Sequence, residues 1–272
     1  MKKIILSVLF AIITVSAVMA CSAINMSYND GIYHFVLSGD KIKKQIKFVS
    51  SPTLITNREV HNNSGSILTI NTGFFDPKNQ KTISYIVMDT QTVEDPLFNE
   101  NLMSNPVLRG NLDKILNRTE FRILDCDGKL KYEIAPHNSN VDFMCTIQTS
   151  AQGGPLLLPV MRMEEEFFVV RNEEGKVIRE SASVLHKTAR TLIGIKNLAN
   201  GKQEVHIFVV TNAHPMTLEE ARDLGKSYDL DSMMAFDGGS STSLDYKNIH
   251  VTSTQDNGDT GRALKSFMII QK

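Results

Sequence analysis

Short segments with the composition of β-strands recur along most of this 272-residue chain, and they restrict the folds that it can adopt. Each segment is rich in β-branched or aromatic residues and is bounded by turn-forming residues. The clearest segments span residues 32–37, 45–50, 66–75, 83–89 and 263–270. Two further pairs of segments predict hairpins, one turning at Asp127-Gly128 and the other at Asn200-Gly201.

Helical patterns are few. Residues 217–230 begin with a capping box from Thr217 to Glu220, and their apolar residues share one helix face. A shorter helical pattern covers residues 110–117. Strands before and after a single well-marked helix favour an α+β fold over alternating βαβ units. We therefore predict a β-rich single domain of mixed or antiparallel sheets with few helices.

The N-terminus has the features of a secretory signal peptide. Two lysines precede an apolar run over 4–18, which at about 15 residues is short for a membrane-spanning helix. Cys21 follows Ala20 in a context that resembles the lipidation motif of bacterial lipoproteins. We predict a lipoprotein signal peptide over 1–20 and a mature domain over 22–272, held at the membrane through a lipid on Cys21. Ordinary cleavage after Ala20, which would release a secreted protein, is the alternative. In both cases the protein is expected in the cell envelope, in the periplasm or outside the cell.

The charge of the chain is nearly balanced, with 29 basic and 30 acidic residues. A nucleic-acid-binding surface needs an excess of basic residues, so nucleic acid is not an expected partner. Phosphate-binding-loop, zinc-protease and calcium-loop motifs are all incomplete. We therefore expect no metal and no cofactor.

Two cysteines lie within the predicted mature domain, and export would place them in an oxidising compartment. Cys126 and Cys145 fall on segments that are candidates for neighbouring strands. They could form one disulfide or remain two buried thiols, because sequence spacing does not show whether their Cα atoms come within bridging distance.

Four segments share one unusual feature: glycine stands beside polar or charged residues at the end or start of a β-like run. They cover 67–77, 152–158, 189–195 and 234–244. Each segment alone is compatible with an ordinary turn. In the last segment, Asp237-Gly238-Gly239 could instead form a pocket, since glycine lets a ligand approach the backbone closely.

Together and in this order, the segments resemble the phosphodiester glycosidase family. The blocks of that family run approximately N-G-G-F-F, G-G-P, R-T-x-x-G and D-G-G-G-S/T, with a helix that opens on Thr-Leu before the last block. In this chain they read Asn71-Thr72-Gly73-Phe74-Phe75, Gly153-Gly154-Pro155, Arg190-Thr191-Leu192-Ile193-Gly194 and Asp237-Gly238-Gly239-Ser240-Ser241-Thr242. Arg262 is similar to an arginine of the closing block. Thr72 and Ser240 depart from the family by replacing glycines, and both add bulk where the backbone would approach a ligand.

The resemblance implies a substrate with an anionic phosphate on an anomeric carbon. A phosphate ester is a better leaving group than a sugar alkoxide, so it needs charge neutralisation more than a protonating acid. Arginine suits this role because it is always cationic and grips phosphate through two N–H groups. We therefore assign Arg190 and Arg262 to the phosphate.

The other roles follow from the same resemblance. Asp237 would stabilise the developing cation, activate water or attack the anomeric carbon, and Asn71 would orient a sugar hydroxyl or the water. Asp76 is either a second acid or a turn residue. The expected contacts to phosphate or sugar come from the N–H groups and hydroxyls of Thr191, Gly153, Gly154, Gly238, Gly239, Ser240 and Thr242.

The implied function is an exported hydrolase that cleaves a sugar-1-phosphodiester or a related glycosidic bond, with a carbohydrate or sugar phosphate as its substrate. A glycan-binding envelope lipoprotein without activity and an exopolysaccharide export factor are the alternatives.

Overall fold

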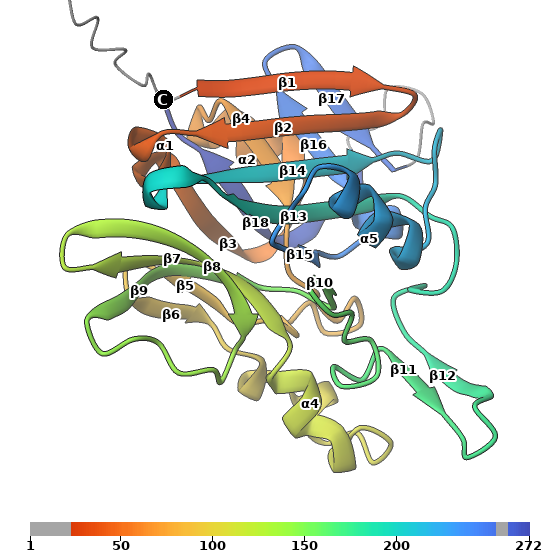
Figure 1. The fold of residues 1–272 in the computed structure, drawn as a ribbon. Helices are drawn as coiled ribbons and strands as arrows, with labels where there is room; N and C mark the ends of the chain where they lie inside the picture. Colours follow the sequence, from red (N-terminus) through yellow and green to blue (C-terminus); the bar gives the residue numbers. More distant parts are fainter. Residues whose placement is uncertain (1–22, 254–260) are drawn as a thin grey trace, which may run out of the picture.

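Three antiparallel sheets form most of the structure, a computed structural model that describes residues 23–253 and 261–272 (Figure 1). The predicted signal peptide and Cys21 lie outside the described residues. The first sheet has the order β1 (Ala23–Asn29), β2 (Ile32–Ser38), β14 (Gln203–Val210), β13 (Arg190–Asn197), β15 (Ser232–Ala235) and β10 (Leu156–Leu158). The second has the order β17 (Ile249–Thr252), β16 (Ser243–Tyr246), β4 (Leu68–Asn71), β18 (Leu264–Ile270) and β3 (Ile46–Ile55).

The third sheet and a small hairpin lie beside these two (Figure 1). The third sheet has the order β6 (Gln91–Glu94), β5 (Ile86–Met88), β9 (Cys145–Gln152), β7 (Thr119–Cys126) and β8 (Lys129–Pro136). The hairpin consists of β11 (Val169–Arg171) and β12 (Val177–Glu180) and projects from the body of the molecule. Every strand pair in the described residues is antiparallel, which confirms the predicted β-rich fold.

Side chains of the central strands β13 and β14 divide between two apolar cores. Ile193 and Ile207 point into a core that all three large sheets share. Their neighbours Leu192 and Phe208 point to the opposite face, where they pack with Ala221 of α5. Because successive side chains of a strand point to opposite faces, both faces of the sheet are buried along most of β13 and β14.

The described residues form five α-helices, of which α5 packs against one face of the first sheet. They are α1 (Asp40–Gln45), α2 (Asn57–Ser64), α3 (Glu100–Met103), α4 (Leu112–Leu116) and α5 (Leu218–Ser227). The predicted capping box is confirmed: the Thr217 hydroxyl accepts from the Glu220 N–H at 3.1 Å, and the Glu220 carboxylate accepts from the Thr217 N–H at 2.9 Å. No helix among the described residues is long and apolar enough to cross a membrane.

A disulfide joins Cys126 of β7 to Cys145 of β9, which face each other across the third sheet. Of the two alternatives left open by the sequence, the structure therefore contains the disulfide. The hairpin at Asp127-Gly128 is also present, and both turn residues adopt the positive φ angles of a tight hairpin turn.

Several strands end at one place, where the first two sheets approach each other. Strand β4 ends at Asn71, β15 ends at Ala235 and β13 begins at Arg190. The predicted strand over 66–75 is therefore shorter than expected, since the chain leaves the sheet after Asn71. This junction holds the candidate site.

Candidate functional site

The backbone of Asp237 is held by both sheets that meet at the junction. The Asp237 N–H donates to the carbonyl of Thr72 at 2.8 Å, and the preceding Phe236 N–H donates to the carbonyl of Thr191 at 2.8 Å. The Asn71 side-chain amide donates to the Asp237 carbonyl at 2.6 Å. Asp237 therefore follows β15 in a fixed position and not in a free turn.

Asn71 and Thr191 form the next layer around this backbone. The Thr191 hydroxyl donates to Asn71 Oδ1 at 2.6 Å, and the Ser243 N–H donates to the same oxygen at 3.1 Å. Both side chains are buried. The structure thus places Asn71 and Thr191 behind the Asp237 backbone, where their side chains bond to protein atoms.

The Asp237 carboxylate is half-buried and faces a cavity. Burial raises its pKa to about 6, while a hydrogen bond from Ser241, the positive charge of Arg262 and the Gly238 N–H each act to lower it. A carboxyl group with this pKa is ionised at neutral pH and protonated in mild acid. A carboxyl pKa near 6 suits acid–base and nucleophilic chemistry at neutral pH.

Arg262 lies beside Asp237, on the segment that leads into β18. Its Nη1 donates to the hydroxyls of Ser240 at 3.1 Å and Ser241 at 3.0 Å. The guanidinium also lies over the Phe75 ring, 4.8 Å from its centroid. Ser240, one of the two departures from the family pattern, thus orients the arginine at the entrance to the cavity.

The cavity has a volume of about 250 Å³ and combines positive charge with apolar walls. Three arginines line it, Arg118, Arg179 and Arg262, and Asp237 is the one carboxylate among its described lining residues. Its apolar lining consists of Phe74, Phe75, Ile83, Leu102, Leu108, Ile115 and Phe168. An anion bound here would meet cations in surroundings of low polarity, where their attraction is strong.

Arg118 and Arg179 are site residues that the sequence analysis did not find. The buried Arg118 donates from Nε to the carbonyl of Glu166 at 3.1 Å, and it lies 3.8 Å from the centroid of the Phe168 ring. Burial lowers its pKa to about 10, against the opposing effect of the Glu166 carboxylate, so it remains cationic. Arg179 donates to the carbonyl of Phe167 at 2.7 Å. Neither arginine belongs to a glycine-containing block, so no motif indicated them.

A family model described as phosphodiester glycosidase matches residues 64–271, which is well over half of the chain. The chain belongs to the phosphodiester glycosidase family. Membership of this family suggests phosphodiester glycosidase activity and a carbohydrate-type substrate.

Solved structures agree with the family at the level of the fold. The catalytic domain of zebrafish N-acetylglucosamine-1-phosphodiester alpha-N-acetylglucosaminidase, auto-inhibited by its pro-peptide, superposes with a TM-score of 0.62 at 14% identity, covering 92% of this chain and 82% of that one. A hypothetical protein from Synechocystis has a TM-score of 0.52 at 12% identity, covering 91% of this chain and 61% of that one. No curated protein sequence matches this chain significantly.

The arginine of the R-T-x-x-G block of this glycosidase family does not line the cavity. Arg190 is buried, and its Nε donates to the carbonyl of Met216 at 2.9 Å. Its Nη2 donates to the carbonyls of Ser183 at 2.7 Å and His186 at 2.6 Å. The two-pronged grip expected for phosphate is thus directed at a loop next to Ser181 and Ala182, which do line the cavity. This placement corrects the expected phosphate contact: Arg190 fixes part of the cavity wall.

The G-G-P block joins the first and third sheets. The Gly153 N–H donates to the carbonyl of Thr119 and the Gly154 N–H to that of Ala235, at 2.9 and 2.8 Å. Gly154 has a φ of +97°, and a Cβ atom there would lie 2.3 Å from Glu166 Oε2. Glycine is needed at position 154 for packing. The sequence analysis expected both N–H groups to contact a ligand, but in the structure both bond to protein carbonyls.

The backbone N–H groups of the D-G-G block also bond to protein atoms. The Gly238 N–H bonds the Asp237 carboxylate, and the Gly239 N–H donates to the carbonyl of Ala189 at 2.8 Å. Thr242 is buried, and its hydroxyl has no hydrogen-bond partner among the described residues. The Gly238 and Gly239 N–H groups thus bond to protein atoms, and they hold the loop that carries Asp237.

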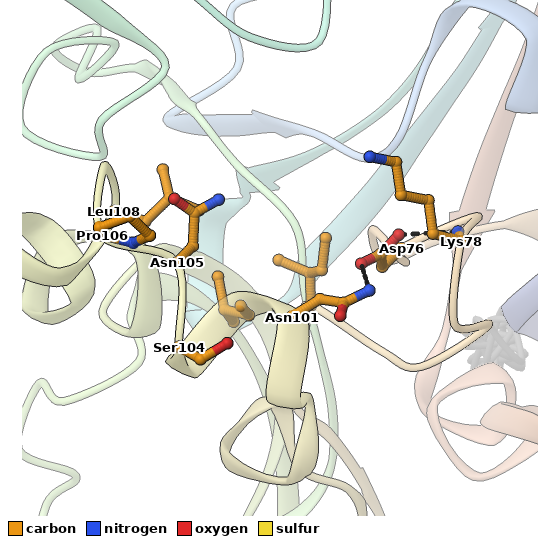
Figure 2. Close-up of a pocket in the computed structure, with 9 residues that line it drawn as sticks. Asp76, Lys78, Asn101, Ser104, Asn105, Pro106 and Leu108 are labelled. Atoms are coloured by element: carbon orange, nitrogen blue, oxygen red, sulfur yellow. Dashed lines mark hydrogen bonds between the residues drawn. The ribbon is translucent and has the colours of Figure 1, made fainter.

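Asp76 and Thr72 also lie outside the cavity. Figure 2 shows Asp76 in a neighbouring cavity of about 510 Å³, where its carboxylate accepts from the Lys78 N–H at 2.8 Å and from the Asn101 amide at 2.9 Å. These bonds favour the turn over the second acid. The Thr72 hydroxyl donates to Ser266 at 3.0 Å inside the second sheet, so its extra bulk does not narrow the cavity.

No group of three or more His, Cys, Asp or Glu side chains capable of holding a metal ion occurs within residues 23–253 and 261–272. The charged groups at the site are therefore the arginines and Asp237. Together they can bind an anion beside a carboxylate of shifted pKa.

Proposed function

We propose that this member of the phosphodiester glycosidase family hydrolyses a sugar-1-phosphodiester between the anomeric carbon and the phosphate. The observation that supports this most is the meeting of one carboxylate, Asp237, with three arginines at one cavity. By its name, the zebrafish relative acts on such a substrate, an N-acetylglucosamine-1-phosphodiester.

In this proposal the phosphate lies against Arg262 at the entrance, and Arg118 and Arg179 add positive charge from the wall. When the bond breaks, its electron pair moves to the phosphate oxygen, and the leaving group is a phosphate monoester. Arginines lower the energy of this step by neutralising the added charge. A general acid is less necessary than in an ordinary glycosidase, which must expel an alkoxide.

Asp237 acts on the sugar side of the same bond. Its carboxylate faces the positive charge that develops on the anomeric carbon, and it stabilises this charge, attacks the carbon or activates water. Asn71 and Thr191 keep the Asp237 backbone in place, so the carboxylate needs little reorganisation as the reaction proceeds. Water finally supplies the hydroxyl of the free sugar and a proton.

We also propose that the protein is exported and carries a lipid on Cys21. The Cys126–Cys145 disulfide supports export, because disulfides persist in oxidising compartments. Cys21→Ala should move the protein from the membrane fraction to the soluble exported fraction. An unchanged distribution would contradict the lipid anchor.

A panel of sugar-1-phosphodiesters tests the proposed activity, with free sugar and phosphate monoester measured together. The proposal expects both products in equal amounts. Saturable binding of these esters without either product would instead indicate a glycan-binding protein that lacks activity.

A further inference from the structure

The cavity at Asp237 differs in chemistry between its two ends. At one end, Arg262 provides N–H donors beside the Asp237 carboxylate. At the other end, the lining residues Ile83, Leu102 and Leu108 are aliphatic. Ser181 is the one uncharged residue with a side-chain hydroxyl among the described residues that line the cavity.

The aliphatic end borders a second, larger cavity. Ile83, Leu102 and Leu108 also line the larger neighbouring cavity of about 510 Å³ (Figure 2). They therefore form a shared wall between the two spaces, which we call the aliphatic wall. Ile83 and Leu108 are half-buried, so part of each side chain is open to a ligand.

The two ends would suit different parts of a phosphodiester. A second sugar placed against the aliphatic wall would turn hydroxyls toward side chains that cannot hydrogen-bond them, which is costly. The polar residues Asp76, Asn101 and Ser104 line only the larger cavity. An alkyl chain would gain from the same burial, by about fourfold in affinity for each methylene removed from water. The sugar on which Asp237 acts needs polar partners and fits the end with Asp237 and Arg262.

We propose that the alcohol esterified to the phosphate is aliphatic and extends from the arginines along the wall formed by Ile83, Leu102 and Leu108. The preferred substrate is thus a glycosyl phosphate of an apolar alcohol and not of a second sugar. This inference rests on the proposed function, because it names the leaving group of that reaction.

The experiment compares three esters of one sugar 1-phosphate, whose second alcohol is ethyl, hexyl or another sugar. The hexyl ester should exceed both others in kcat/KM by at least about tenfold, since several additional methylenes are buried. Equal rates for the ethyl and hexyl esters, or a preference for the disaccharide ester, would overturn the inference and leave the proposed function standing.

Binding of hexyl phosphate and ethyl phosphate, measured by calorimetry, tests the wall without any turnover. Tighter binding of hexyl phosphate is expected, and equal affinity would overturn the inference. Hexyl-selective binding together with no hydrolysis of any ester would support the wall and overturn the proposed function. The two failures are thus distinguishable.

Substitutions in the aliphatic wall test whether the preference for the hexyl ester arises there. Leu108→Ser and Ile83→Thr should each remove most of the hexyl preference, and thermal melting checks that both variants fold. Val107→Ser is the matched control, because Val107 is the neighbour of Leu108 but is 70% exposed. A preference for hexyl that survives in folded Leu108→Ser and Ile83→Thr would show that the chain binds elsewhere.

Discussion

The two sides of the candidate site are built in different ways. Behind Asp237, the family blocks form a layer of internal hydrogen bonds in which Asn71, Thr191 and Gly239 all bond to protein atoms. In front of Asp237, the cavity wall comes largely from segments without any block, including those that carry Arg118 and Arg179.

This difference separates the position of the carboxylate from the recognition of the ligand. The blocks hold the backbone at the junction of the sheets, where a small shift would move Asp237. The facing wall supplies the charge and the apolar surface that a substrate meets. Changes in the block residues behind Asp237 should therefore act through geometry and stability, and changes in the wall should act through binding.

The largest effect is expected for Asp237→Asn. This change keeps the size of the side chain but removes the charge that faces the developing cation, so kcat should fall by about a hundredfold or more. Steady-state kinetics on a sugar-1-phosphodiester measures the loss. Asp76→Asn is the matched control and should keep nearly normal kcat, because Asp76 belongs to a turn in the other cavity. Near-normal kcat in folded Asp237→Asn would remove Asp237 from the mechanism.

Arg262→Gln should have the next largest effect. It removes the cation at the entrance but leaves an amide that can bond Ser240, so KM should rise by about tenfold or more, as expected for a lost charged hydrogen bond. Inhibition by inorganic phosphate should weaken to a similar extent. An unchanged KM and unchanged phosphate inhibition would exclude Arg262 from phosphate binding.

A plot of kcat/KM against pH should fall on its acidic side because the Asp237 carboxylate becomes protonated. If the carboxylate is the active form, kcat/KM falls as pH decreases through about 6, the pKa that burial gives this group. Arg262→Gln should move this fall to higher pH, because the arginine charge lowers the pKa of Asp237. If kcat/KM of Arg262→Gln falls at the same pH as in the unchanged protein, a group other than Asp237 controls the fall.

The same pKa has a consequence for stability. A carboxyl whose pKa is raised in the folded state stabilises the fold when it is protonated, and this contribution is lost as pH rises through about 6. Asp237→Asn, which is always neutral, should therefore melt at a higher temperature than the unchanged protein at neutral pH. At a pH below the unfolded pKa of aspartate, the two should melt at similar temperatures.

Arg190→Lys should affect stability more than catalysis. Lysine cannot reproduce the three hydrogen bonds to the carbonyls of Met216, Ser183 and His186, so the free energy of unfolding should fall by about 1–3 kcal/mol. Below the melting range, KM should change by only a few-fold. A KM increase as large as that of Arg262→Gln would show that Arg190 contributes to phosphate binding.

The smallest effect on activity is expected for the double variant Cys126→Ser, Cys145→Ser. The disulfide lies at the end of β7 opposite to Thr119, about 25 Å along the strand. Its loss should lower the free energy of unfolding by about 3 kcal/mol and leave kcat nearly unchanged. A large fall in kcat of the folded variant would show that the third sheet transmits changes to the cavity.

Local chemistry made part of this structure predictable from the sequence. The capping box at Thr217 and the hairpin at Asp127-Gly128 depend on neighbouring residues only, and both are present. The order of the glycine blocks indicated the family, and Asp237 and Arg262 do meet at the cavity.

The partners of the polar groups could not be predicted in the same way. Arg190 has the chemistry of a phosphate ligand, but its direction depends on the loop that packs around it. The Gly153 and Gly154 N–H groups bond carbonyls that are distant in sequence, which only the assembled sheets bring near. Arg118 was missed because its place in the cavity depends on Phe168, which is also distant in sequence.

The central claim is that Asp237 acts at the anomeric carbon while the arginines hold a phosphate that leaves as a monoester. Hydrolysis of a sugar-1-phosphodiester in isotopically labelled water tests this most directly, with the phosphate product analysed by phosphorus NMR. Cleavage between carbon and oxygen leaves the phosphate monoester without label, and this is the predicted result. Label in the phosphate product would mean that water attacks phosphorus, and the assignment of Asp237 to the anomeric carbon would be wrong.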